Sequence, residues 1–356
     1  MGNVFRKKFQ TNGRVLFVEP SDKIMNAMTR LGFTKYEVLT YWTLLVNGPS
    51  TARKISEESG IPYNRVYDTV TSLKARGFVT EVEGSPRVYA AFSPSIAFMR
   101  LKSDIDDLKE LFEEELSKSK RRGREKPAIW RTTNINEAIE MVRESIASSE
   151  YEIILVAPEK FLEEIKKDLE NALKRGVTLS IYTGGEASLN GIRGKGNLFI
   201  RRFHRLNHFI GMFDGKEVID IQNIGLRPRN PPSFKATYPE IIFAQYAFVR
   251  EAFQESELLI EDVNKKHDVR FFTTFHAVDL IRKYLPRQKI YAEIVGRNLS
   301  TGEIERLSGQ VVGYSVVLEE GIDNFDLKIN GSVVKVGGMF AVLEEYETTK
   351  IRLILE

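Results

Sequence analysis

One short stretch of the chain, residues 62–76, carries side chains that can hydrogen-bond to the edges of nucleobases. Asn pairs with adenine, Arg with guanine, and Asp accepts from the amino group of cytosine. At 100° per residue, Val66, Val70 and Leu73 form a narrow apolar stripe. The polar residues opposite or beside that stripe are Asn64, Arg65, Asp68, Thr71 and Ser72. This pattern predicts a recognition helix whose polar side enters the DNA major groove.

Four further polar residues are suited to contacts with phosphates or with DNA that flanks the site. They are Tyr63, Tyr67, Lys74 and Arg76. Arg87, in the wing, is expected to meet the DNA backbone or the minor groove. The alternative interpretation is that the polar face is only the solvated side of a packed helix. The order of the neighbouring elements favours DNA binding over this alternative.

Those neighbouring elements predict a winged helix-turn-helix over residues 21–95. Thr34 is expected to cap one of its helices and Ser50 the next one. Pro62 is expected at the start of the recognition helix, where its missing N–H costs nothing. The wing is predicted as two strands, over 78–83 and 87–92, around a Gly-Ser-Pro tip.

Residues 96–126 are predicted to form a short coiled-coil helix that pairs two copies of the chain. A heptad seam is indicated by apolar residues that step by four, three and four: Leu101, Ile105, Leu108 and Phe112. Winged helices usually read palindromic sites as two-fold dimers, which favours a homodimer and leaves higher assembly open. The alternative is that this helix packs against its own domain. The basic run at 118–126 is expected to be a solvated linker that can add phosphate contacts.

The remaining residues predict two further domains, which makes the chain an α+β multidomain protein. Residues 127–265 alternate between strands and helices, which predicts an α/β layer structure with parallel pairing. Helices are expected over 135–149, 159–175 and 239–259, and strands over 151–156, 177–182, 199–203, 209–213 and 216–221. Residues 266–356 are predicted as a small, mostly β domain with one helix over 276–284. Asn330 and Gly331 indicate a hairpin turn in it.

The composition of the 356-residue chain narrows its class. A hydrophobic content of 42% suits globular domains, and a net charge of only +3 confines any nucleic-acid affinity to a local surface. Cysteine is absent, which excludes disulfides and thiolate chemistry. No run approaches the ~20 apolar residues of a membrane span, so we expect a cytoplasmic protein with no membrane partner. Residues 1–20 are expected to be an N-terminal extension, with Met25 and Met28 as alternative starts.

The sequence holds no recognisable catalytic, metal or cofactor motif. The four histidines, His204, His208, His267 and His276, lack metal-ligand spacing. A P-loop, a nucleophile elbow and a dinucleotide fingerprint are absent. Glu186 and the glycines of residues 191–197 are typical of loops. We therefore expect no metal, no cofactor and no enzymatic activity.

A different segment, GGMFAVLEEYE at residues 337–347, is suited to a small polar ligand. Adjacent glycines allow close backbone approach, Met339 and Phe340 offer apolar surface, and Glu344 can accept from hydroxyls. Sugars require this combination of an apolar wall and fixed acceptors. Spacing alone favours the alternative, a β-bulge followed by an ordinary strand or helix start, over a ligand site.

Four long blocks resemble the TrmB family of archaeal sugar-responsive transcriptional regulators, and the similarity runs from about Leu31 to the C-terminus. The blocks are GFTKYEVLTYWTLLVNGPSTA, GIPYNRVYDTVTSLKARGFV, NPPSFKATYPEIIF and VKVGGMFAVLEEYE. Within the family, the chain is most similar to the maltodextrin-sensing members and their paralogues. The resemblance implies an N-terminal winged helix, a dimerising helix and an α/β domain similar to the phospholipase D fold.

Enzymes of that fold use a His-x-Lys motif followed by an Asp. The matching stretch here is His208-Phe209-Ile210 with Asp214 further on, so isoleucine replaces the phosphate-binding lysine. The resemblance therefore implies an active site that has lost its catalytic function.

The resemblance also places an oligosaccharide site between the α/β domain and the β domain. Its residues carry over to Gly338, Met339, Val342, Leu343 and Glu344. Two positions differ, because a family asparagine is Asp323 here and a family serine is Ala247.

The sequence thus predicts a dimeric regulator of sugar uptake and of glycolytic or gluconeogenic genes. Double-stranded operator DNA and a maltose- or maltotriose-like oligosaccharide are its expected partners, with repression and also activation as modes of action. The other hypotheses are an architectural DNA-binding protein without sugar response and a phospholipase-D-like hydrolase. The operator, the exact sugar and the direction of its effect are left open.

Overall fold

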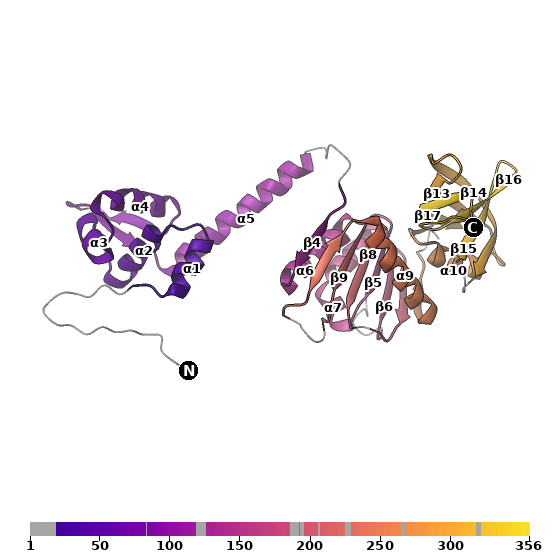
Figure 1. Ribbon diagram of the computed structural model, residues 1–356, viewed down its shortest axis with the longest axis horizontal. Helices are drawn as coiled ribbons and strands as arrows, with labels where there is room; N and C mark the ends of the chain where they lie inside the picture. Colours follow the sequence, from indigo (N-terminus) through magenta and orange to yellow (C-terminus); the bar gives the residue numbers. More distant parts are fainter. Residues whose placement is uncertain are drawn as a thin grey trace. The chain divides into compact units, whose positions relative to one another are not determined.

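The computed structural model divides into two compact units, residues 1–123 and 124–356 (Figure 1). It describes residues 19–356 apart from 83, 119–125, 186–191, 193–195, 206, 225–228, 265–267 and 318–321. The loop candidates around Glu186 and Gly194, His267, and most of the basic run at 118–126 lie outside the described residues. Within the described ranges, no helix combines the length and the apolar character needed to cross a membrane.

The first unit is a winged helix-turn-helix, as predicted. Its helices are α1 (Asp22–Arg30), α2 (Lys35–Asn47), α3 (Ala52–Ser59) and α4 (Tyr63–Ala75). A three-stranded sheet follows in the order β1 (Ser50–Thr51), β3 (Val88–Ala91) and β2 (Val79–Val82). The core holds fully buried side chains from every layer of the unit, among them Phe33, Leu44, Ile55, Val66, Leu73 and Phe78.

Helix capping explains where these elements begin. Thr34 and Glu37 form a reciprocal capping box, which satisfies two backbone N–H groups at the start of α2. Two details of the prediction are wrong. Thr51, rather than Ser50, caps α3, because Ser50 is drawn into a short strand that pairs with the wing. Pro62 precedes the first helical residue of α4 and keeps an extended ψ of 132°.

A 25-residue helix, α5 (Pro94–Lys118), leaves the winged helix. Leu101, near its start, packs against the core of the first unit. Further along, the predicted seam is exposed: Ile105, Leu108, Phe112 and Leu116 show 53%, 53%, 62% and 67% of their surface. The alternative in which this seam packs inside its own domain is therefore wrong for the described residues.

The second unit begins with an eight-stranded sheet covered by helices on both faces. Its strand order is β11 (Glu257–Asp262), β7 (Leu198–Arg202), β6 (Thr178–Thr183), β5 (Glu152–Val156), β8 (Phe209–Phe213), β9 (Glu217–Ile221), β10 (Ser233–Ala236) and β4 (Ile129–Thr132). Only β5, β6 and β7 pair in parallel, so the expectation of parallel pairing holds for the centre and fails for the remaining strands.

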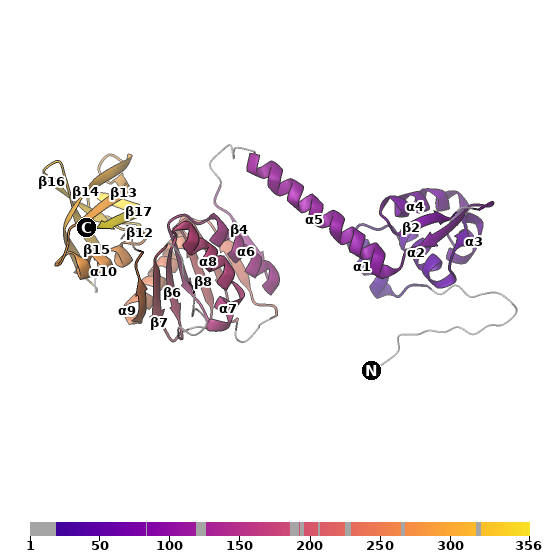
Figure 2. The ribbon, with the colours of Figure 1, turned by 180° about the vertical axis from the view of Figure 1, so that it is seen from behind.

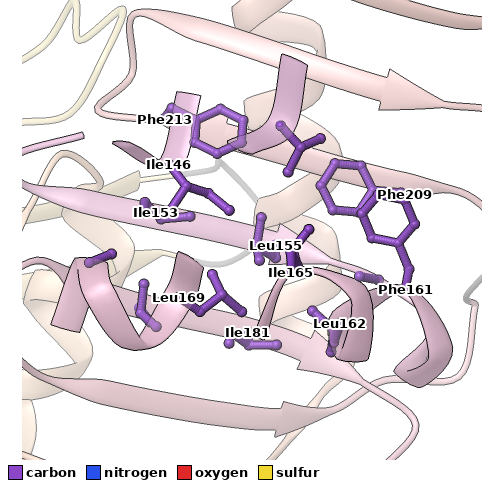
Figure 3. Close-up of a cluster of buried hydrophobic side chains, with 14 of the residues drawn as sticks. Ile146, Ile153, Leu155, Phe161, Leu162, Ile165, Leu169, Ile181, Phe209 and Phe213 are labelled. Carbon is purple, nitrogen blue, oxygen red and sulfur yellow. The ribbon is translucent and has the colours of Figure 1, made fainter. Parts of the chain in front are cut away.

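Alternation along the central strands builds a core on each face of the sheet. On one face, Ile153, Leu155 and Ile181 pack under α6 (Ile135–Ser148), α7 (Glu159–Glu164) and α8 (Lys166–Arg175), as Figure 3 shows. The next residues along, Ile154, Val156 and Tyr182, pack under α9 (Pro239–Glu255). Figures 1 and 2 show α9 and the other three helices on opposite faces. Burial on both faces explains why β5 has apolar residues at every position from Ile153 to Val156 instead of an alternating pattern.

Two predicted helices are shorter than expected. The helix over 159–175 is interrupted at Ile165 and becomes α7 and α8. The helix over 239–259 ends at Glu255, and the chain continues directly into β11, an edge strand that pairs with β7. Strands β4, β10 and β11 were not predicted. Two of them, β4 and β11, pair with strands that lie far away along the chain.

The C-terminal part is a six-stranded sheet with one helix, α10 (Thr274–Tyr284). The strand order is β12 (Asp268–Phe271), β17 (Tyr346–Leu355), β13 (Ile290–Asn298), β14 (Ile304–Val317), β15 (Ile322–Ile329) and β16 (Ser332–Gly337). Strand β16 also pairs with β17, so five strands close into a ring. Asn330 and Gly331 connect β15 to β16 with φ angles of +49° and +92°, which confirms the predicted turn.

A buried carboxylate, Glu152 on β5, connects the α/β layer to the C-terminal part. It is fully buried and accepts hydrogen bonds from Ser180 Oγ at 2.8 Å, Phe272 N at 3.0 Å and Thr273 Oγ1 at 3.1 Å. Its Oε1 lies 2.6 Å from His276 Nδ1, and His276 Nε2 lies 2.5 Å from the Tyr182 hydroxyl. The start of α10 is therefore held against the central strands by a hydrogen-bonded network.

Replacing Glu152 by alanine should destabilise the second unit by about 3–5 kcal/mol, since the buried partners of a charged group are left unsatisfied. Glu163→Ala, an exposed position on α7, is the matched control and should have little effect. Denaturant unfolding of the full chain measures the difference. Equal stability of the two variants would contradict the role given to Glu152.

Candidate DNA-binding helix and ligand cavity

Helix α4 separates its two faces as the sequence indicates. Val66, Val70 and Leu73 are buried in the core of the winged helix. Four of the predicted base-reading residues, Asn64, Arg65, Asp68 and Thr71, are exposed. The polar flank is thus free of the fold's own interior, and its contact with DNA stays a prediction.

Ser72 differs from the other four residues, because it faces the fold. Its hydroxyl donates to Glu37 Oε1 at 2.5 Å, and Glu37 is itself buried on α2. Burial alone would raise the pKa of Glu37, but hydrogen bonds from Ser72 and Thr34 and the charge of Arg76 outweigh burial and lower it. Ser72 therefore ties α4 to α2 in this structure rather than pointing toward a groove.

Four of the residues predicted to contact phosphates, flanking DNA or the minor groove form two small groups, and the fifth, Arg76, is paired with Glu37 at 3.7 Å. Tyr63 and Tyr67 lie one turn apart on α4, with hydroxyl oxygens 2.8 Å apart and rings in an edge-to-face arrangement. Lys74 and Arg87 both pair with Glu81 on β2, at 2.7 Å and 3.5 Å. The hydrogen bond from Lys74 lowers the pKa of Glu81. Glu81 thereby holds two cations near the wing, where phosphates would compete for them.

The second candidate site is a cavity of about 220 Å³ in the second unit. The segment 338–344 forms most of its wall, and it is completed by Tyr246 on α9, Thr274 on α10 and Asp323 on β15. Six of the seven predicted sugar-binding residues are brought together there: Gly338, Met339, Val342, Leu343, Glu344 and Asp323. Ala247 is exposed on α9 beside Tyr246 and does not line the cavity.

Close packing explains the paired glycines of this segment. A Cβ atom on Gly337 would lie 2.6 Å from Cδ of Glu344, and one on Gly338 would collide with Thr274 Oγ1. Because they lack side chains, Gly337 can lie directly against the Glu344 side chain, and Gly338 can lie against Thr274 on α10. Phe340 adopts a left-handed φ of +66°, with its N–H donating to Glu347 at 2.7 Å.

The wall combines one anchored acid with exposed apolar side chains. Glu344 accepts from Asn324 Nδ2 at 3.0 Å and from the backbone N–H of Leu343 at 3.2 Å. Val342 and Leu343 are 82% and 72% exposed, unusually high for aliphatic side chains beside a cavity. An oriented acceptor next to open apolar surface matches the chemistry expected for a sugar site.

Asp323 is already engaged in an ion pair. Its Oδ2 accepts from Arg250 Nε at 2.7 Å, which joins β15 to α9. Burial raises the pKa of Asp323, and Arg250 opposes this rise. Arg250, Tyr246 and Thr274 were not found from the sequence, because they lie on α9 and α10 and have no local motif that marks them.

The residues that match the phospholipase D motif are not assembled into a catalytic cluster. His208 precedes β8 and Asp214 follows it, so they lie at opposite ends of a strand, roughly 20 Å apart at 3.3 Å per residue. Asp214 instead accepts three backbone N–H groups at the start of β5, from Glu150, Tyr151 and Glu152. In the part of the chain that the structure describes, no group of three or more potential metal ligands is found.

Comparison with known proteins is consistent with this geometry. Residues 28–95 match the family model described as the sugar-specific transcriptional regulator TrmB. Residues 128–258 match the N-terminal subdomain of the TrmB EBD, and residues 266–356 match the C-terminal subdomain of the TrmB/TrmBL1 EBD.

Among curated proteins, the HTH-type sugar sensing transcriptional regulator TrmBL1 of Pyrococcus furiosus is 28% identical over 340 residues, which cover 92% of this chain and 97% of that protein. The uncharacterized protein YrhO of Bacillus subtilis is 28% identical over 169 residues, covering 46% and 60% of the two chains.

Two solved structures are similar at lower levels. TrmBL2, an archaeal chromatin protein, is 19% identical with a TM-score of 0.34, covering 67% of this chain and 99% of its own. The phospholipase D family member Nuc of Salmonella typhimurium is 14% identical with a TM-score of 0.30, covering 38% and 99%. The three family models account for the winged helix and for both parts of the second unit, and the chain belongs to the TrmB family of transcriptional regulators.

Proposed function

We propose that this chain is a dimeric, sugar-responsive transcriptional regulator that reads operator DNA with α4. A maltose- or maltodextrin-type oligosaccharide, bound at the 338–344 segment, alters the affinity for operator DNA. Depending on where the operator lies, the protein represses or activates genes for sugar uptake and for glycolysis or gluconeogenesis. The observation that carries the proposal is the exposed polar flank of α4, with Asn64, Arg65 and Asp68 turned away from a fully buried apolar stripe.

The ligand part of the proposal rests on the cavity around Glu344. Its volume of about 220 Å³ is below the roughly 300–1,000 Å³ that is usual for ligand pockets. We therefore expect the exposed segment from Phe340 to Leu343 to move when an oligosaccharide enters. Asp323 is held by Arg250, so its negative charge is shielded from the sugar.

The coupling between the two sites is a free energy, typically about 1–3 kcal/mol, which changes operator affinity several-fold to about a hundredfold. By linkage, operator DNA changes sugar affinity by the same factor. An architectural protein without sugar response would show equal operator affinity with and without maltotriose. Turnover of a phosphodiester or of maltotriose would instead indicate a hydrolase.

Asn64→Ala should relax base preference at one operator position by about 1–3 kcal/mol, since a bidentate contact to one base is lost. Arg87→Ala should weaken binding evenly across sequences. It should also reduce the slope of log affinity against log salt concentration by about one, since one phosphate contact is lost. Titration of matched and mismatched duplexes at several salt concentrations measures both effects. The assignment of α4 fails if Asn64→Ala keeps the full preference.

Glu344→Ala should abolish the response to maltotriose while operator affinity without sugar stays nearly unchanged, because Glu344 orients the cavity wall and lies in the other unit. Glu303→Ala removes an exposed acid from the turn between β13 and β14, so it is the matched control. Calorimetry with maltose and maltotriose, together with operator titrations, gives the readout. A normal sugar response in the Glu344 variant would mean that the pocket lies elsewhere.

Leu108→Lys on α5 should dissociate the dimer, because it places a charge in the exposed apolar seam. Glu110→Gln changes the net charge by the same amount off the seam and should leave the dimer intact. Sedimentation velocity of the full chain distinguishes the two. If both variants sediment like the unchanged protein, the seam on α5 does not pair copies of the chain.

A further inference from the structure

A second and larger cavity, of about 350 Å³, lies in the α/β layer beside the start of β8. Its walls come from the segment before β8 (Arg205, Asn207 and His208), from Ile210 in β8 and from α9 (Gln245 and Phe248). It shares no lining residue with the cavity around Glu344. None of the roles proposed above uses it.

A buried carboxylate lies behind this cavity. Asp220 on β9 is only 6% exposed, and its Oδ2 accepts from Gln245 Nε2 at 3.3 Å. Among the described residues its Oδ1 has no hydrogen-bond partner, and His208 Nδ1 is 3.7 Å away, within ion-pair reach but beyond hydrogen-bond distance. A buried acceptor without a partner is costly, so a small inward shift of His208 would be favourable.

Asp220 determines which atoms the cavity wall offers to a ligand. The carboxylate can only accept, so it orients the amide N–H of Gln245, and the Nδ1–H of His208 on closer approach, toward itself. Gln245 then keeps its carbonyl oxygen for the cavity, and the tautomer of His208 that carries its proton on Nδ1 keeps Nε2 as an acceptor. The wall therefore offers acceptors at His208 and Gln245, beside the amide of Asn207, which can both donate and accept.

The charges around the cavity narrow the ligand class further. The guanidinium of Arg205 is bonded to Glu251 at 3.0 Å and Glu255 at 2.8 Å, and Ile210 supplies no cation. A phosphate finds its negative charge unmatched here, because the guanidinium of Arg205 is already paired with two carboxylates and the buried carboxylate of Asp220 lies behind the wall. A neutral molecule with hydroxyl groups suits the acceptors, and Phe248 adds an apolar wall.

We propose that this cavity binds a small neutral hydroxylated molecule, a sugar or polyol, which donates hydroxyl groups to His208 Nε2 and to the Gln245 carbonyl. Asp220 is a positioning residue that sets the orientation of both side chains. The site is independent of the oligosaccharide site proposed above, since the two cavities are formed by different residues.

Acylation by diethyl pyrocarbonate tests the proposal, because the reagent attacks a free imidazole nitrogen. The rate at His208 is followed by mass spectrometry in the full chain, with the exposed His204 as internal control. Saturating D-glucose, myo-inositol or maltose should slow modification of His208 about fivefold or more and leave His204 unchanged. Protection should persist in Glu344→Ala, which separates this site from the first one. Inorganic phosphate and ethanolamine should give no protection.

Two variants examine the named contacts. Gln245→Ala and Asp220→Asn should lose the protection, whereas Gln254→Ala, an exposed position near the end of α9, should keep it. Circular dichroism and the unchanged reactivity of His204 control for misfolding. The proposal is overturned if none of the three polyols protects His208, if protection disappears in Glu344→Ala, or if phosphate or ethanolamine protects as well as the polyols do.

Discussion

The architecture of the second unit depends on one buried charge, the carboxylate of Glu152. Its hydrogen-bond donors come from β6, from the backbone that enters α10, and from His276 on α10 itself. A carboxylate at this depth is stable only while all of these donors are present. The α/β layer and the start of α10 must therefore be in place together, and the ring of strands is oriented by a contact near the middle of the sheet.

This anchoring limits the motion that a ligand can produce. The Glu152 network fixes the two parts at one point, and the Arg250–Asp323 ion pair fixes α9 to β15 at a second point. The segment from Phe340 to Leu343 is held much less firmly, because its aliphatic side chains are mostly in solvent. Local rearrangement of that segment is consequently easier than rotation of one whole part against the other.

The sequence predicts the local features of the fold well and the distant ones poorly. The capping box at Thr34, the faces of α4 and the turn at Asn330-Gly331 depend on neighbours within a few residues, so their signals are complete in the sequence. The edge strands β4 and β11, the orientation of Ser72 toward Glu37 and the Arg250–Asp323 pair depend on partners tens of residues away. Neither the helical nor the strand periodicity of a sequence reveals a partner at that distance along the chain.

The same distinction applies to the candidate ligand site. Gly338, Met339 and Glu344 belong to one contiguous block, so the resemblance to the family could assign all three to the site at once. Tyr246 and Thr274 complete the cavity only because α9 and α10 are folded against that block. Ala247 is the opposite case. It was expected at the site only because it matches a family serine, and in the structure its neighbour Tyr246 lines the cavity instead.

The closed ring of strands has a seam only two residue pairs long, Val336 with Tyr346 and Gly337 with Glu347. Were this seam to part, β16 would lose its cover at Val336 and Gly337, whereas most of that edge of β17 would stay paired with β12; an uncovered strand edge such as that of β16 readily recruits other chains. The 338–344 segment is the connection between those two strands. A molecule that fastens this connection would therefore also protect the protein from aggregation, whatever it does to gene expression.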